Sequence, residues 1–259
     1  MTTFSVRTAN LPAINSMTKY PSIPTYHSLD PRNGGLLDEA VAFSGTVVGT
    51  EKVDGTNSRI ILLPDGTYLL GSREELLYAQ GDLIGNPALG IVDALRPIAD
   101  SLPAVDGDRI VVHYLEVYGG KVTAASKQYT GGKAVGFRMF DVAVVGDYRE
   151  MSDWDPQRIA HWRDAGGQAF LDEASLRRTA EGIGLDLTPR LFELDAAAMP
   201  GDIPGMKAFL DERMPATLAA LDGDAGGRPE GIVLRTSDRS VIAKARFQDY
   251  ERTLKRRGR

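Results

Sequence analysis

The sequence contains no cysteine and only three histidines, and this excludes several kinds of site. Without cysteine the chain has no disulfide, no thiolate metal ligand and no thiol for redox chemistry. His27, His113 and His161 are far apart in the sequence and lack the spacing of a metal site. We interpret His113 and the tryptophans Trp154 and Trp162 as packing residues, because nothing in the sequence pairs them with a nucleophile.

Long hydrophobic runs are also absent. No segment approaches the length of a membrane span, and the N-terminal residues lack the apolar stretch of a secretion signal. We therefore expect a cytoplasmic protein with no membrane association. The net charge of −5 is weak evidence against a general nucleic-acid coat, although it leaves room for a local basic site.

A lysine followed by Asp-Gly stands between predicted strands, in the run Glu51-Lys52-Val53-Asp54-Gly55. Residues 46–50 and 56–63 are rich in β-branched and apolar side chains, and Pro64-Asp65-Gly66 predicts a turn into a further strand over 67–70. An amine attacks phosphorus only in its neutral form, which burial or neighbouring cations favour. Lys52 is therefore a candidate covalent nucleophile, and Gly55 gives the backbone freedom to turn beside a bulky ligand.

Acidic, aromatic and basic side chains mark the later predicted strands. Tyr114, Glu116 and Tyr118 share one face of a strand over 109–118, which we interpret as a groove wall. The strand over 135–145 carries Phe140 and Asp141. The strand over 231–236 carries Arg235, and the strand over 241–246 carries Lys244 and Arg246. A phosphate-binding P-loop around residues 127–134 is excluded, because Lys127 and Ala134 replace the required glycine and hydroxyl residue.

Short β runs without regular βαβ alternation predict an α+β fold with antiparallel sheets. We expect residues 1–43 to form an arm packed on the core, with a short strand. Residues 152–222 are predicted as a helical insertion, with helices over 155–163, 173–183 and 204–221, the second ending at Gly184. Further helices are predicted over 88–101, over 248–256, and after Ser72, where Glu75 occupies the capping-box position.

Taken in order, these motifs resemble those of the covalent nucleotidyltransferases, the superfamily of polynucleotide ligases and RNA capping enzymes. The resemblance covers about residues 51–252 and is greatest to the ATP-dependent RNA ligase branch. It implies an antiparallel-sheet adenylyltransferase domain over 44–259, with no separate C-terminal domain. It also implies an enzyme that joins 3′-hydroxyl and 5′-phosphate ends through a covalent lysyl-AMP intermediate and an adenylated 5′ end.

The resemblance assigns roles to particular residues. Lys52 corresponds to the adenylated lysine, and Glu230 and Lys244 complete the catalytic set, with Glu230 as the metal ligand. Arg59 and Arg235 are candidates for binding phosphate or a strand end. Lysine is commoner in the family than Arg235 or Arg246, so the cation that polarises the α-phosphate is left open, with Lys244 favoured. The residues assigned to nucleotide binding are Glu51, Asp54, Asn57, Arg73, Glu116, Phe140, Lys244 and Arg246, with Tyr118 as the alternative stacking residue.

The implied cofactors are ATP and Mg²⁺, with Mn²⁺ as an alternative to Mg²⁺. The implied partner is a nucleic acid, RNA or DNA, with ends or nicks to be joined. A partner protein is one way to take the place of a C-terminal domain in holding the substrate. A DNA ligase, a capping-type guanylyltransferase and a catalytically inactive nucleic-acid-binding module of the same fold stay open. Asn57 after Asp54-Gly55 favours a ligase, because capping enzymes usually place arginine near that position.

Overall fold

The computed structural model describes residues 4–81 and 90–258, in which the strands form sheets of six, four and two members. The named strands pair antiparallel within these sheets, and helices are mixed with them, so the predicted α+β class is confirmed. The six-stranded sheet has the order β6-β5-β4-β7-β8-β9. Its members are β4 (Thr56–Leu62), β5 (Tyr68–Ser72), β6 (Leu76–Ala79), β7 (Ile110–Gly119), β8 (Val135–Val145) and β9 (Ala169–Phe170).

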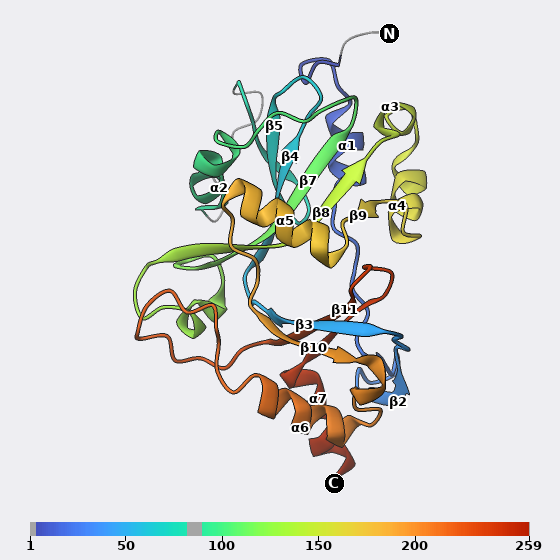
Figure 1. The fold of residues 1–259 in the computed structure, drawn as a ribbon, viewed down its shortest axis with the longest axis vertical. Helices are drawn as coiled ribbons and strands as arrows, with labels where there is room; N and C mark the ends of the chain where they lie inside the picture. The colour runs from blue at the N-terminus through green and yellow to red at the C-terminus, as the bar shows by residue number, and fades with distance from the viewer. Residues whose placement is uncertain (1–3, 82–89, 259) are drawn as a thin grey trace.

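The four-stranded sheet forms the centre of a second lobe and has the order β10-β3-β11-β12 (Figure 1). Its members are β3 (Thr46–Lys52), β10 (Arg190–Asp195), β11 (Gly231–Thr236) and β12 (Ile242–Arg246), and a separate pair consists of β1 (His27–Leu29) and β2 (Leu36–Ala40). Strand β3 ends at Lys52 and β4 begins at Thr56. The short loop between them therefore carries the chain from one lobe to the other.

Helices cover both faces of the six-stranded sheet, because neighbouring residues of each strand point to opposite sides. Ile61 packs with α1 (Leu11–Met17), α3 (Tyr148–Met151) and α4 (Pro156–Asp164), whereas Ile60 packs with α2 (Ile91–Ala99) and α5 (Glu173–Ile183). The four-stranded sheet packs one face on α6 (Ile203–Arg213) and α7 (Phe247–Arg257). The remaining helical turns are η2 (Ala124–Gln128) and η3 (Ala196–Ala198). The opposite face of the four-stranded sheet is left for the site.

The structure corrects several predicted elements. Ser72 accepts bonds from the amides of Glu74 and Glu75, as a helix cap would, but the chain turns into strand β6. The arm contains helix α1, which was not predicted, and α6 ends at Arg213 rather than extending to residue 221. The predicted helix over 88–101 appears as α2, and its first two residues lie outside the described ranges.

The segment 152–222 contains the expected helices and also strands β9 and β10, which were not predicted. These strands lie at the edges of the six-stranded and four-stranded sheets, so the segment is part of both lobes. Helix α5 has the predicted bounds, with Asp172 as N-cap and Gly184 in the left-handed conformation at its C-cap. Within residues 4–81 and 90–258, no helix is both long and apolar enough to cross a membrane.

Candidate functional site

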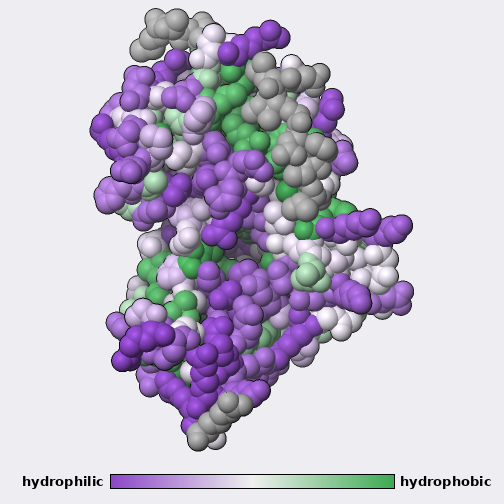
Figure 2. Space-filling view, turned by 180° about the vertical axis from the view of Figure 1, so that it is seen from behind, coloured by the Kyte–Doolittle hydropathy of each residue, from purple (hydrophilic) through white to green (hydrophobic). Residues whose placement is uncertain are grey.

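A pocket of about 400 Å³ lies at the waist between the lobes, where the surface is hollowed (Figure 2). Its floor is the face of the four-stranded sheet that the helices leave open. The strand register aligns Lys52 and Arg246 with Gly231, and it aligns Thr50 and Lys244 with Val233. Because side chains alternate along a strand, these residues point to the same side of the sheet. The predicted motifs therefore meet in one cavity.

The loop that follows Lys52 is fixed by hydrogen bonds from its backbone amides to side chains. The amide of Asp54 donates to the Tyr129 hydroxyl at 2.6 Å, and the amide of Gly55 donates to the Glu116 carboxylate at 3.1 Å. A side chain at position 55 would lie 2.3 Å from the carbonyl oxygen of Val117. Glycine is thus required here for close approach to β7, which explains the Asp-Gly sequence after the lysine.

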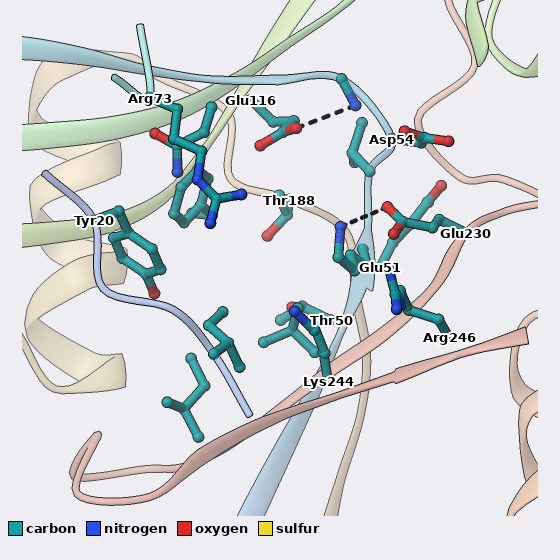
Figure 3. Close-up of a pocket in the computed structure, with 18 of the residues that line it drawn as sticks. Tyr20, Thr50, Glu51, Asp54, Arg73, Glu116, Thr188, Glu230, Lys244 and Arg246 are labelled. Atoms are coloured by element: carbon teal, nitrogen blue, oxygen red, sulfur yellow. Dashed lines mark hydrogen bonds and ion pairs between the residues drawn. The ribbon is translucent and has the colours of Figure 1, made fainter. Parts of the chain in front are cut away.

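The Lys52 amine forms an ion pair with Glu230, with 2.5 Å between Nζ and Oε2 (Figure 3). Lys52 and Glu230 are half-buried, with 24% and 15% of their side chains exposed. Lys244 and Arg246 project from β12, which β11 separates from the Lys52 strand β3. Burial, followed by the charges of Arg246 and Lys52, lowers the pKa of Lys244. A cluster of partly desolvated cations facing one carboxylate is a site that favours an anionic ligand.

Glu116 faces the Lys52 loop from strand β7 (Figure 3). Burial raises the pKa of its carboxyl group to about 7, and the opposing effects of the Lys52 charge and the Gly55 amide are smaller. Near neutral pH this group is therefore divided between its neutral and ionised forms. An ionised carboxylate can accept hydrogen bonds from hydroxyl groups such as those of a ribose, and the role of Glu116 beside a nucleotide stays a prediction.

We expect Glu116→Gln to stabilise the ligand-free protein in alkaline solution. The folded-state pKa of about 7 exceeds the ordinary value of 4.5, so the wild type loses stability as the pH rises between these values. The full loss corresponds to about 3 kcal/mol. Urea unfolding at pH 4.5 and pH 8.5 measures the free energy of unfolding. The variant should be more stable than the wild type only at pH 8.5.

Glu74→Gln is the matched control for this measurement. Glu74 is largely exposed, and its hydrogen bond from Lys19 lowers the pKa of its carboxyl group. An ionised Glu74 therefore stabilises the fold above its ordinary pKa of 4.5, and its removal should cost a little stability at pH 8.5. Equal responses of both variants at the two pH values would contradict the assignment for Glu116.

Phe140 lines the pocket and belongs to an aromatic cluster. Its ring meets the edge of Tyr20 at 5.0 Å between centroids and stacks on Tyr114 at 6.2 Å. Tyr118, the alternative stacking residue, is fully buried against Tyr129 away from the pocket lining, so that alternative is wrong. Tyr114 is also fully buried, so of the predicted groove wall on β7 only Glu116 lines the pocket.

The arginines proposed to bind strand ends serve the fold instead. Arg59 is fully buried and donates to Ser72 O, Asn15 O and Thr18 Oγ1, and burial lowers its pKa to about 10. It does not line the pocket, because its face of β4 points toward helix α1. The expectation that Arg59 binds an end is therefore wrong.

Arg235 reaches the pocket wall, yet it is only 3% exposed. Its guanidinium lies 2.9 Å from the Glu173 carboxylate and 3.6 Å from that of Asp141. These contacts join β11 to the other lobe, so the side chain acts as an internal ion-pair partner. Arg235 is consequently poorly placed for the predicted contact with a strand end.

The other predicted nucleotide-binding residues line the pocket. Asn57 holds a buried Oδ1 with no hydrogen-bond partner among the described residues, an acceptor that a ligand donor can satisfy. Arg73 is 62% exposed at the pocket rim. The Glu51 carboxylate points to the chain after α6, accepting hydrogen bonds from Thr217 Oγ1 and the Leu218 amide, so its side chain anchors the lysine strand.

The sequence analysis missed the part of the wall formed by the N-terminal arm. Residues 20–23 line the pocket, and the arm runs beside β12, where the Tyr26 amide donates to the carbonyl oxygen of Lys244. Thr188 and Tyr129 were missed as well, the first in the pocket lining and the second below the lysine loop. No local pattern marks these residues, because each reaches the site through contacts distant in sequence.

The carboxylates of the pocket are compatible with a hard divalent cation bound together with phosphates. Within residues 4–81 and 90–258, no group of three or more acidic or histidine side chains is arranged to hold a metal by itself. Magnesium typically takes one or two protein carboxylates, with water and substrate phosphate oxygens as its other ligands. Glu230 can supply such a carboxylate, and Glu116 is a further carboxylate of the same pocket lining (Figure 3).

Comparisons with known proteins find structures of similar fold. A structure of the Naegleria gruberi RNA ligase with PPi is similar, with a TM-score of 0.59 and 14% identity, covering 94% of this chain and 59% of that one. An archaeal ATP-dependent RNA ligase has a TM-score of 0.50 and 17% identity, over 90% of this chain and 49% of that one. This chain therefore spans about half to three-fifths of the length of these ligases.

Naegleria gruberi ligase variants solved with ATP and Mn are similar too, one of them with a TM-score of 0.53 and 14% identity, over 83% of this chain and 52% of that one. At these identities the likeness shows the fold. No curated protein matches the sequence. The family model described as RNA ligase matches residues 45–254, which include the lysine motif and both basic strands. The chain belongs to the RNA ligase family.

Proposed function

We propose that the protein is an ATP-dependent RNA ligase that joins 3′-hydroxyl and 5′-phosphate ends through a lysyl-AMP intermediate. The observation that carries this proposal is the pairing of the half-buried Lys52 amine with Glu230 in a pocket that also holds Lys244 and Arg246. Membership of the RNA ligase family supports it. Further support comes from the similar Naegleria gruberi ligase structures solved with PPi or with ATP and Mn.

In the first step the neutral Lys52 amine attacks the α-phosphorus of ATP. A nitrogen–phosphorus bond forms, the bond to the bridging oxygen breaks, and pyrophosphate leaves with the electron pair. The Glu230 carboxylate, 2.5 Å from the amine, is placed to accept the proton that Lys52 gives up. Lys244 and Arg246 lie on β12, which flanks β11, and their charges stabilise negative charge on the phosphates.

In the second step the terminal 5′-phosphate of a strand attacks the AMP phosphorus and displaces Lys52, which regains its proton. In the third step a 3′-hydroxyl attacks the strand phosphate and AMP leaves. Phe140 and Val233 offer apolar contacts for the adenine, and Glu116 an acceptor for the ribose. Catalysis in all steps then depends on alignment and on cations that neutralise phosphate charge.

We assign Glu230 as the carboxylate that holds a divalent cation, with substrate phosphates as further ligands. When bound, such a cation neutralises charge that develops on the phosphate oxygens. Both Mg²⁺ and Mn²⁺ accept oxygen ligands of this kind.

Incubation with α-labelled ATP or GTP and Mg²⁺, followed by a denaturing gel, tests the proposal. Label should remain on the protein with ATP and be absent with GTP. Label from GTP alone would favour a capping-type guanylyltransferase. A folded protein that takes label from neither, and carries no AMP by mass spectrometry, would be an inactive binding module.

The strand type is tested in a second assay, in which 5′-phosphorylated RNA and DNA oligonucleotides of the same sequence are offered to the labelled protein. Transfer of label to RNA in preference to DNA is the expected result. Preference for a nicked DNA duplex would instead indicate a DNA ligase.

A further inference from the structure

A second recess, of about 510 Å³, opens beside the nucleotide pocket. The two cavities share Tyr20, Pro21, Ser22 and Arg73 in their linings. The far wall of the recess consists of Ser16 and Lys19 from the arm and Arg163 from α4. Apart from Arg73, none of the residues to which the sequence motifs assign a role lines it.

The charges in this recess are arranged with the cations inside and the carboxylates outside. Lys19 and Arg163 are sheltered, with 26% and 14% of their side chains exposed. Their partners Glu74 and Asp164 are far more open, at 72% and 60%, and lie 2.9 Å from them. The recess therefore presents partly desolvated positive charge toward its interior.

Exchange of these carboxylates for a phosphate would cost little. Ion pairs that involve exposed carboxylates contribute little to stability, so Glu74 and Asp164 can turn toward solvent. Arg163 stays in place without its acid, because it also donates to the Ser16 carbonyl oxygen at 3.1 Å. Hydroxyl groups of Ser16 and Ser22 add neutral hydrogen-bonding groups to the lining.

Arg73 lies where the recess joins the nucleotide pocket, on the side that also carries Tyr20 (Figure 3). Lys244 and Arg246, the cations suited to the ATP phosphates, project from strand β12 in a different part of the pocket (Figure 3). The recess is thus separate from the triphosphate cations but continuous with the space in front of Lys52. A ligand with repeated phosphates could occupy it and place one end in the pocket.

We propose that the recess binds the phosphodiester backbone of the nucleic-acid strand whose 5′-phosphate receives AMP. This inference rests on the proposed ligase function. Lys19 and Arg163 contact backbone phosphates behind the reacting end, and Arg73 guides that end toward Lys52. Contacts to phosphate are independent of base sequence, so the recess grips strands of any sequence.

Lys19→Ala and Arg163→Ala test the proposal in the intact chain. A 5′-phosphorylated RNA oligonucleotide is the probe, and transfer of AMP from the labelled protein to the strand is measured against strand concentration. Each variant should raise the strand KM about tenfold, the effect of one lost charge-assisted contact. The slope of log affinity against log salt concentration should also fall by about 1. Labelling of the protein by ATP, without a strand, reports that the variants fold.

Lys207→Ala is the matched control, because Lys207 forms an ion pair with Asp211 on α6, far from both cavities. It should leave the strand KM and the salt slope at their wild-type values. If the wild type seals strands and the Lys19 and Arg163 variants show the same strand KM and salt slope as this control, the recess does not bind the strand. A raised KM for ATP, with no change for the strand, would reassign the recess to the triphosphate. Failure of the wild type to take label would instead refute the ligase function.

Discussion

Lys52→Arg should abolish formation of the AMP adduct, with the rate of labelling falling on the order of 10⁴-fold or more, as for other covalent nucleophiles. Arginine keeps a positive charge opposite Glu230, so the ion pair and the local fold are preserved. A guanidinium does not give up its proton near neutral pH and cannot attack phosphorus. Mass spectrometry of the protein after incubation with ATP measures the loss.

The same variant should still seal a strand that carries AMP on its 5′ end before it is added. That step breaks the bond between the strand phosphate and AMP and needs no nitrogen nucleophile. Its rate should stay within about a hundredfold of the wild type, a loss that altered geometry alone can cause. Equal losses in labelling and in sealing of the adenylated strand would show that Lys52 does not act as the nucleophile.

Lys244→Arg is the matched control, because Lys244 is the other lysine in the pocket lining. This variant keeps the charge on β12 and retains Lys52, so the adduct should still form and map to Lys52. An adduct that maps to Lys244 in the Lys52→Arg variant would show that the nucleophile is Lys244 on β12 and not Lys52 on β3.

The sequence predicted the elements whose patterns are local. Strand β11 and helix α5 have the expected bounds, because alternation and helical spacing are visible within each segment. The Ser72 turn shows the limit of such patterns, since its capping bonds form without a helix. Strand β10 was missed because it is defined by pairing with β3, more than a hundred positions earlier in the chain.

The sequence analysis named residues that the structure brings together in one pocket, but it missed part of the pocket wall. Lys52, Glu116, Glu230 and Lys244 all line one pocket, because each sits at a characteristic place in a strand motif. Arg59 was misassigned since alternation separates two faces of β4 but does not say which one meets helix α1. The arm could not be assigned, because its residues reach the pocket by running beside β12.

Asp141 connects the lobes, and its replacement should be the most destabilising change near the pocket. The carboxylate is fully buried on β8 of the six-stranded sheet. It lies 2.8 Å from Arg239, which follows β11, and 3.6 Å from Arg235 on β11 itself. It also accepts a hydrogen bond from the Tyr20 hydroxyl at 2.9 Å. One acid therefore compensates buried cations of the other lobe and holds an aromatic residue of the pocket wall.

Asp141→Asn should lower the free energy of unfolding by about 3 to 5 kcal/mol, because it leaves the buried Arg239 guanidinium without a compensating charge, whereas Arg235 keeps its ion pair with Glu173. Asp108→Asn is the matched control, since Asp108 also pairs with an arginine and a tyrosine, Arg149 and Tyr148, but is 50% exposed. The control should lose much less stability, because its ion pair is open to solvent. Urea unfolding of both variants at neutral pH makes the comparison, and equal losses would contradict a buried link between the lobes.

Asp141→Asn should also weaken ATP binding. This second effect would distinguish ion pairs that position the pocket wall from ion pairs that only stabilise the fold. Tyr20 loses its charged acceptor in the variant, and its ring supports Phe140 by an edge contact at 5.0 Å between centroids. Asp108 lies outside the pocket lining, so its variant should bind ATP as the wild type does. A rise in the ATP KM for labelling in Asp141→Asn alone would mean that the ion pairs between the lobes also position the wall of the nucleotide pocket.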